Sequence, residues 1–259
     1  MKGRSILGGA LAVAASLVLA GTALAAGFTN GVFAPSTPTT FSAETVGAPY
    51  TGQTVLPANT IPDWNVTKGN VDWIGSYWQA PPAWPGQTSA PANSIDLNGF
   101  TTGAISQTFN TTLNSTHVVQ FYLSGNPDPN SICDSMGLSD CYSLANKTGT
   151  VGAAGTAAQE FAFDTSLHGN TRDAMGWVQA SAYSFVASST STTLTFTSTT
   201  SGAFGPVIGN VTVTETAATG AMCKDGGWKT MYDENGALFK NQGDCVSFYA
   251  TSGAVPIGS

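Results

Sequence analysis

Aromatic and polar side chains able to bind sugar gather in the stretch Ile61 to Gln79 and in the loops that follow. Pyranose rings present apolar C–H faces that stack on aromatic rings, and their hydroxyl groups need hydrogen-bond donors and acceptors. The sequence predicts a carbohydrate-binding site from eight residues: Asp72, Trp73, Tyr77, Trp78, Gln79, Trp84, Asn126 and Asp128.

Each aromatic side chain of this set has an alternative role in the hydrophobic core. Trp64 and Trp177 are assigned to the core. For Trp73 the core and the binding site are equally favoured. Pro and Gly flank the remaining three, which favours exposed loops. The side chains predicted to lie at the surface are Tyr77, Trp78 and Trp84.

The other residues form no recognisable catalytic motif. The chain has no G-x-S-x-G motif, and His168 lies on a polar loop, where a solvated histidine is the simpler interpretation. A glycosidase needs two carboxylates that flank a cleft. The candidate acids are scattered singly, and Asp96, between Ile95 and Leu97, is assigned a structural role. We therefore expect a non-catalytic protein.

The charge balance excludes several partners. The formal net charge is −7, and it becomes −9 without residues 1–26, which carry two basic and no acidic residues. An acidic chain without a basic run argues against nucleic acid and against an anionic membrane surface. Few charges with abundant Thr, Ser, Asn and Gly are typical of an all-β extracellular protein.

The N-terminus has the pattern of a secretory signal peptide. Lys2 and Arg4 precede the apolar run 6–20, and Ala23-Leu24-Ala25 is a small-x-small cleavage site. We predict that residues 1–26 are a cleaved signal peptide, with an uncleaved N-terminal anchor as the alternative.

The cysteines Cys133, Cys141, Cys223 and Cys245 form an even set, which in an exported protein implies disulfides. Three pairings exist, and the local one, Cys133–Cys141 with Cys223–Cys245, is the simplest. Each closed loop would stabilise the fold by about 3 kcal/mol. A zinc site is disfavoured because the chain has no C-x-x-C motif.

Alternation of apolar and polar residues predicts short strands separated by turns. The stretch Ile61 to Gln79 is read as two strands joined by a turn at Lys68-Gly69, and residues 35–60 as loop with one edge strand. Residues 125–159 are interpreted as an insertion with little to bury. Further strands are expected at 28–33, 93–98, 103–110, 117–124, 160–164, 175–186, 192–198 and 207–214. This pattern predicts an antiparallel β-sandwich or barrel.

The ordered blocks of the chain resemble DUF642 proteins, and most of all the bacterial choice-of-anchor C domain. The matching blocks are NGVFAP (30–35), IPDWNVTKGNVDWIGSYWQ (61–79), SIDLNG (94–99), GAISQTF (103–109), FYLSGNPD (121–128), FAFDTS (161–166), MGWVQASAYSFVAS (175–188) and TLTFTSTTSGAFGPVIGNVTV (193–213). The resemblance implies a galactose-binding-domain-like β jelly roll that is exported and associated with cell-surface or wall polysaccharide.

Two departures from the family pattern concern a structural calcium. The first block usually carries Glu where this chain has Ala34, and the last carries Asp where it has Gly209. Calcium requires several oxygen ligands, carboxylates among them. Loss of both acids argues against bound calcium, and no other cofactor is predicted.

The C-terminal segment resembles a short Cys-bounded tail of exported actinobacterial proteins, through Cys-Lys-x-Gly-Gly-Trp and Phe-Lys-Asn-Gln-Gly-x-Cys-Val-Ser. It shows no Leu-Pro-x-Thr-Gly sorting motif and no terminal apolar span. We expect a jelly-roll domain over 27–216 and a linker with a disulfide-closed appendage over 217–259, without a transmembrane anchor in the mature protein.

These observations favour a secreted module that binds a polysaccharide or cell-wall glycan. The first alternative is a structural or adhesion protein whose aromatic residues contact another surface protein. The second is an unrecognised hydrolase. A glycan array separates the first two, because an adhesion protein would bind no glycan, and an assay for released sugar tests the third.

Overall fold

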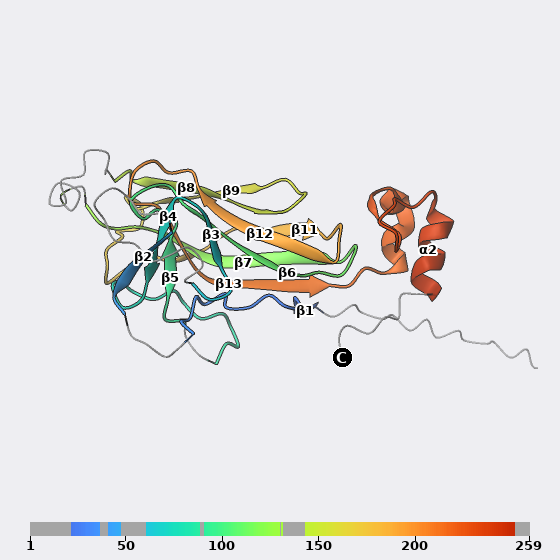
Figure 1. Cartoon of the computed structure of the whole chain (residues 1–259), viewed down its shortest axis with the longest axis horizontal. Helices are drawn as coiled ribbons and strands as arrows, with labels where there is room; N and C mark the ends of the chain where they lie inside the picture. Colours follow the sequence, from blue (N-terminus) through green and yellow to red (C-terminus); the bar gives the residue numbers. More distant parts are fainter. Residues whose placement is uncertain are drawn as a thin grey trace, which may run out of the picture.

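The computed structural model describes residues 22–36, 41–47, 61–88, 91–129, 131 and 143–251. Over these ranges the chain forms two antiparallel sheets packed face to face, followed by a helical C-terminal unit (Figure 1). The predicted all-β antiparallel sandwich of jelly-roll type, with a small disulfide-closed appendage, is confirmed.

The larger of the two described sheets has the strand order β10-β7-β13-β5-β4-β2, with β1 also paired to β13 and β11 to β7. Its strands are β1 (Thr22–Leu24), β2 (Ala43–Gly47), β4 (Asn70–Ile74), β5 (Ser94–Asp96), β7 (Thr116–Gly125), β10 (Val178–Gln179), β11 (Tyr183–Val186) and β13 (Pro206–Thr216).

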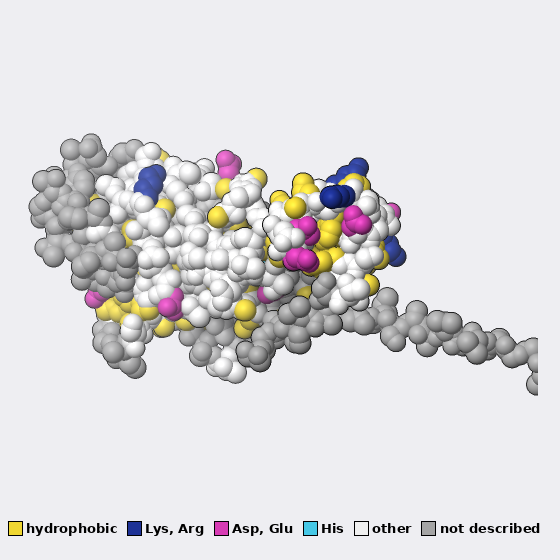
Figure 2. Space-filling view, turned by 45° about the vertical axis from the view of Figure 1, so that its right-hand side comes forward, with side chains coloured by type: hydrophobic (Ala, Val, Ile, Leu, Met, Phe, Trp, Pro, Cys, Tyr) yellow, Lys and Arg dark blue, Asp and Glu magenta, His cyan; other side chains and the backbone are white. Residues whose placement is uncertain are grey.

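The smaller described sheet has the order β3-β6-β12-β8-β9. Its strands are β3 (Asn65–Lys68), β6 (Ala104–Asn110), β8 (Asn146–Ala153), β9 (Gln159–Asp164) and β12 (Ser191–Ser198). In β12, Leu194 and Phe196 are buried, whereas the alternate threonines are half-buried on the outer face. Figure 2 shows that the visible face of the sandwich consists mostly of backbone and of side chains that are neither apolar nor charged.

The core between the sheets is rich in aromatic rings. Trp64 is 1% exposed and packs at 5.4 Å from Phe33 and 6.1 Å from Phe196, measured between ring centroids. The predicted core role of Trp64 is therefore confirmed. Trp73 also belongs to this core, because it is 4% exposed and its Nε1 donates to the Phe33 carbonyl at 2.9 Å.

The stretch Ile61 to Gln79 contains the two predicted strands, β3 and β4, joined at Lys68-Gly69. They do not pair with each other, because β3 pairs with β6 in one sheet and β4 with β2 and β5 in the other. Gly69 has a φ of 49°, and a Cβ there would lie 2.3 Å from the Thr102 carbonyl oxygen. The turn therefore carries the chain from one sheet to the other.

Two strand assignments differ from the sequence prediction. Residues 28–33 form no strand but irregular chain with a turn at Gly31-Val32, and φ is 47° at Asn30 and 53° at Phe33, so the predicted first strand is wrong. Within the predicted insertion, β8 lies between β12 and β9. Its Gly149 makes room for Phe161, whose ring would lie 2.5 Å from a Cβ at that position. Few apolar residues therefore suffice for a buried strand there.

The C-terminal unit consists of a 3₁₀ segment η1 (Gly220–Thr230) and the helix α2 (Gln242–Thr251). The predicted disulfide Cys223–Cys245 joins them, and Met231 and Phe239 pack against it. The other predicted bridge, Cys133–Cys141, lies outside the described residues. In Figure 2, lysine and acidic side chains gather on this unit.

The predicted signal peptide is described only in its last residues. Residues 1–21 lie outside the described part, whereas Thr22–Leu24 form β1 and pair with β13. Across the ranges that the structure describes, no helix is long and apolar enough to cross a membrane. The cleavage of residues 1–26 and the domain limits remain predictions.

Candidate functional site

The candidate site is built on the outer face of the larger sheet. Asp72 on β4 lies opposite Asp96 on β5, which lies opposite Val207 on β13. Successive side chains of a strand point to opposite faces, and their neighbours Trp73 and Ile95 belong to the core. Asp72 and Asp96 therefore share the face turned away from the core.

Two loops cover this outer face. Trp78, from the loop after β4, packs with Ile74, Val207 and Met175, and the last comes from the loop before β10. The loops also bind each other, since Gln79 N–H donates to the Arg172 carbonyl at 2.7 Å. A side chain on either loop is thus held against the end of the sheet.

A compact polar cluster joins the two loops to the segment after β7. Tyr77 OH donates to Asp128 Oδ2 at 3.1 Å, and Arg172 Nε donates to Asp128 Oδ1 at 2.7 Å. The Arg172 guanidinium carbon lies 4.2 Å from the centroid of the Tyr77 ring. The Asp128 side chain is 7% exposed and that of Arg172 is 42% exposed, so the charged pair is reachable from solvent on the arginine side.

Asp96, on the adjoining strand β5, is linked to this cluster by hydrogen bonds through Asn126. It is fully buried and accepts hydrogen bonds from the Asn98 and Gly205 amides at 2.9 and 3.1 Å and from Asn126 Nδ2 at 2.6 Å. Asn126 Oδ1 in turn accepts from the Asp128 amide at 2.8 Å. The chain of contacts from Asp96 to Asp128 therefore fixes the segment that carries the Asp128 carboxylate, in agreement with a structural role for Asp96.

The carboxyl groups of this face have perturbed acidities. Burial raises the pKa of Asp72 to about 7, against an opposing hydrogen bond from Thr45 Oγ1 at 2.6 Å and with a further rise from the charge of Asp128. Burial and the charge of Asp72 hold the pKa of Asp96 well above its usual value. Burial lowers the pKa of the fully buried Lys147 to about 8. Asp72 therefore keeps a proton at mildly acidic pH.

Of the predicted site residues, the structure brings together Tyr77, Asn126 and Asp128, with Asp72 on the adjoining strand. Gln79 is exposed, and its Oε1 accepts from the Met175 amide at 2.9 Å. It therefore organises the covering loops in addition to facing solvent.

The prediction that Trp78 lies at the surface is wrong. Its side chain is 5% exposed, and its Nε1 donates to Ser94 Oγ at 3.0 Å. The loop turns back over the outer face of the sheet, so the ring fills space between sheet and loop. Trp177, assigned to the core, is only half-buried at the edge of the same cluster, where its Nε1 donates to the Gln79 carbonyl at 3.1 Å.

Trp73 and Trp84 lie away from the polar cluster. Trp73 points into the core between the sheets. Trp84 is half-buried, its ring packs at a tilt with its centroid 4.4 Å from that of Tyr122, and its Nε1 donates to the Asn210 carbonyl at 2.8 Å. Since Tyr122 precedes the end of β7 by three residues, Trp84 covers the outer face nearer the middle of the strand.

At the place where the family pattern indicates calcium, the oxygens of Asn30 and Phe33 already accept hydrogen bonds. The carbonyl oxygens of Asn30 and Phe33 accept hydrogen bonds from Trp64 and Trp73, and Asn30 Oδ1 accepts from the Ala34 amide. A Cβ on Gly209 would lie 2.6 Å from Pro81 Cγ, so an aspartate there would collide with the covering loop. Over the described ranges, no three His, Cys, Asp or Glu side chains form a metal-binding group.

Arg172 is the site residue that sequence reasoning missed, because it lies in a segment interpreted only as a polar loop. One signal was available: Arg4 and Arg172 are the two arginines of the chain, and Arg4 falls in the predicted signal peptide. His168 of the same loop is exposed and stacks at 4.5 Å on Phe163.

Several solved carbohydrate-binding modules are similar to the chain in structure. The family 35 module of Paenibacillus barcinonensis shares 17% identity over 60% of this chain and 94% of its own, with a TM-score of 0.33. The family 35 module of Clostridium thermocellum shares 13% sequence identity, covers 58% of this chain and 91% of its own, and has a TM-score of 0.35. The family 35 module from Cellvibrio japonicus Abf62 shares 11% sequence identity, covers 55% of this chain and 83% of its own, and has a TM-score of 0.32.

The sequence comparisons give a family without a described function. No curated protein matches the chain significantly. A family model described as "Protein of unknown function (DUF642)" matches residues 31–214, which is more than half of the chain. The chain therefore belongs to the DUF642 family.

Proposed function

We propose that this protein is a secreted, non-catalytic module that binds polysaccharide of the cell envelope or its surroundings. The observation that carries the proposal is the cluster of Tyr77, Asp128 and Arg172 at one end of the sandwich. It combines an aromatic ring with a charged acceptor and a charged donor, the groups that sugar rings and hydroxyls need.

The cluster is held ready for a ligand by the protein itself. Asp128 is fixed through Asn126 by the buried Asp96, and Arg172 is fixed by Asp128 and by the backbone of Gln79. A site whose side chains are already ordered loses less conformational entropy when it binds. Export is supported by the Cys223–Cys245 disulfide, because disulfides persist in oxidising compartments.

A glycan array on the mature protein, followed by affinity measurements on the polysaccharide it identifies, tests the proposal. Arg172→Gln removes the charge that bridges Asp128 and Tyr77, and we expect binding to weaken about ten-fold, or 1–2 kcal/mol. Tyr77→Ala should have a similar effect. The matched control is Lys68→Gln, which removes an exposed charge from β3 in the other sheet and should leave binding unchanged.

Two results would contradict the proposal. The absence of any glycan ligand would favour a structural or adhesion protein that contacts other surface proteins. Release of free sugar from the bound polysaccharide would identify a hydrolase. If a glycan binds but Arg172→Gln and Tyr77→Ala bind it as the wild type does, the site lies elsewhere on the sandwich.

A further inference from the structure

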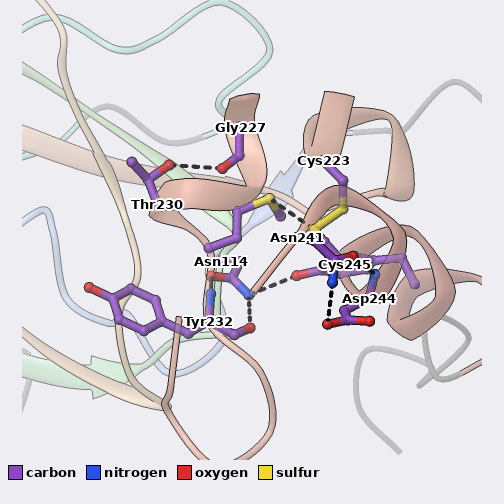
Figure 3. Close-up of a disulfide and its surroundings, with 10 residues drawn as sticks. Asn114, Cys223, Gly227, Thr230, Tyr232, Asn241, Asp244 and Cys245 are labelled. Carbon is purple, nitrogen blue, oxygen red and sulfur yellow. Dashed lines mark hydrogen bonds between the residues drawn. A yellow bond between two sulfur atoms is a disulfide. The ribbon is translucent and has the colours of Figure 1, made fainter. Parts of the chain in front are cut away.

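The C-terminal unit contacts the sandwich through the side chain of Asn114, in the turn between β6 and β7. Asn114 Oδ1 accepts from the Tyr232 amide at 2.8 Å, and Nδ2 donates to the Tyr232 carbonyl and to Tyr249 OH, both at 2.7 Å. Figure 3 shows the Asn114 side chain pointing at Tyr232 beside the disulfide. One carboxamide thus makes three hydrogen bonds to residues more than a hundred positions away.

This side chain acts in the manner of a backbone peptide group. A carboxamide offers a carbonyl oxygen and two N–H donors, and here all these groups meet the C-terminal unit. The residue is 2% exposed, so the bonds are shielded from water. On detachment these groups would bond to water instead, so each bond contributes about 0.5–1.5 kcal/mol to the docked arrangement.

Asn114 recognises the folded form of the unit. Tyr232 belongs to the segment between η1 and α2 and forms an isolated bridge with Leu238, whereas Tyr249 lies on α2. The Cys223–Cys245 disulfide and the apolar cluster of Met231 and Phe239 hold these two segments together. Tyr232 and Tyr249 can therefore reach one carboxamide only when the unit is folded.

The backbone of Asn114 fits this role. Its φ is 65°, in the left-handed region that Asn adopts more readily than most residues. The adjoining backbone is anchored as well, because the Asn114 amide donates to the Ala187 carbonyl at 2.8 Å. The side chain therefore projects from a rigid turn.

We propose that residues 220–251 form a module docked in one orientation on the sandwich, with Asn114 as the residue that specifies the docking surface. The module lies at the end where β7 begins, whereas Asn126 and Asp128 follow the end of the same strand (Figure 1). Ten residues of extended chain span roughly 33 Å. The module is thus held away from the candidate sugar site.

Small-angle X-ray scattering and limited proteolysis of the linker at residues 217–219 test the docking on the mature, oxidised protein. Asn114→Gly removes the carboxamide but keeps the left-handed backbone accessible. We expect a larger maximum dimension in scattering and roughly ten-fold faster linker cleavage. The control Asn235→Gly changes an exposed asparagine in a turn of the C-terminal unit and should match the wild type.

Tyr249→Phe provides a second variant that leaves the sandwich unaltered. It removes a single hydrogen bond to Asn114, and we expect linker cleavage to accelerate about three-fold or more. The proposal is overturned if wild-type scattering requires many positions of the unit, or if Asn114→Gly and Tyr249→Phe both behave as the wild type.

Discussion

The two ends of β7 organise polar side chains in different ways. Beyond its last residue, Asn126 and Asp128 join Asp96, Tyr77 and Arg172 in a network with an exposed arginine. Before its first residue, the carboxamide of Asn114 makes three hydrogen bonds to the C-terminal unit. The end of β7 at Gly125 is therefore ordered and accessible to solvent, and we call it the open end. The end at Thr116 is covered by the C-terminal unit, and we call it the closed end.

The closed end also contains polar groups whose bonding is incomplete. His117 and Glu215 are buried with 3.8 Å between Nε2 and Oε2, and burial lowers the pKa of His117. Within the described part of the chain, His117 Nε2, Glu215 Oε1 and Ser115 Oγ have no hydrogen-bond partner. The open end satisfies the Asp96 carboxyl group with three donors, although in the described residues Asn98 Oδ1 and Asn170 Oδ1 also lack a partner there. The comparison shows that order at the candidate site comes from the protein's own hydrogen bonds.

Loss of Trp78 should have the largest effect on the open end. Trp78→Ala removes a buried ring and the bond to Ser94, so we expect a loss of about 3–5 kcal/mol in the free energy of unfolding. Chemical denaturation measures it, with Trp64→Ala as the reference for a core truncation of the same size. A loss below about 1 kcal/mol would show that the covering loops are not held by this ring.

Removal of the disulfide should affect only the closed end. The double variant Cys223→Ala, Cys245→Ala should destabilise the C-terminal unit by about 3 kcal/mol, because a closed loop restricts the unfolded chain. Hydrogen exchange should increase over residues 220–251, while β7 and β13 stay protected. Equal loss of protection in both strands would mean that the unit and the sandwich unfold together.

Trp84→Ala should have an intermediate effect at the middle of the outer face. It removes the ring contact with Tyr122 and the bond to the Asn210 carbonyl, which together contribute about 2 kcal/mol. Thermal unfolding measures the change, and Trp84→Phe, which keeps the ring contact, should lose about half as much. An unchanged melting temperature for Trp84→Ala would show that the ring contributes nothing to stability, as the predicted surface role requires.

The smallest predicted effect is a pH dependence of the open end. The pKa of Asp72 is raised from 3.8 to about 7, so between these values the folded protein holds a proton that the unfolded chain has released. The contribution is full below about pH 4 and is lost as pH rises through 7. Screening by solvent reduces it to about 1 kcal/mol.

Thermal unfolding of wild type and Asp72→Asn at pH 5 and pH 8 measures this contribution. The wild type should be more stable at pH 5 by a few degrees relative to the variant, because the amide that replaces the carboxyl group carries no charge at either pH. The same pH difference in both proteins would show that Asp72 ionises freely in the fold.

The sequence by itself determined the strands whose side chains alternate and the turn between β3 and β4. In β7, in β12 and in the second half of β13, buried and less buried residues alternate with period two, as a half-buried strand requires. The Lys68-Gly69 turn was evident from its glycine. The strand β8 was not, because its Gly and Thr residues carry little apolar signal and its burial depends on Phe161 of the next strand.

Only the tertiary structure decided which side chains form the candidate site. Alternation showed that Asp72 and Trp73 point to opposite faces, but it could not show which loop covers each face. The loop after β4 folds over the outer face and so buries its own Trp78. The loop before β10 brings Arg172 to Asp128, which lies 44 positions earlier in the sequence. Likewise, Asn114 reads as an ordinary turn residue until Tyr232 and Tyr249 lie beside it. Periodicity reports the local backbone, whereas contacts between distant segments depend on how the sheets and loops pack.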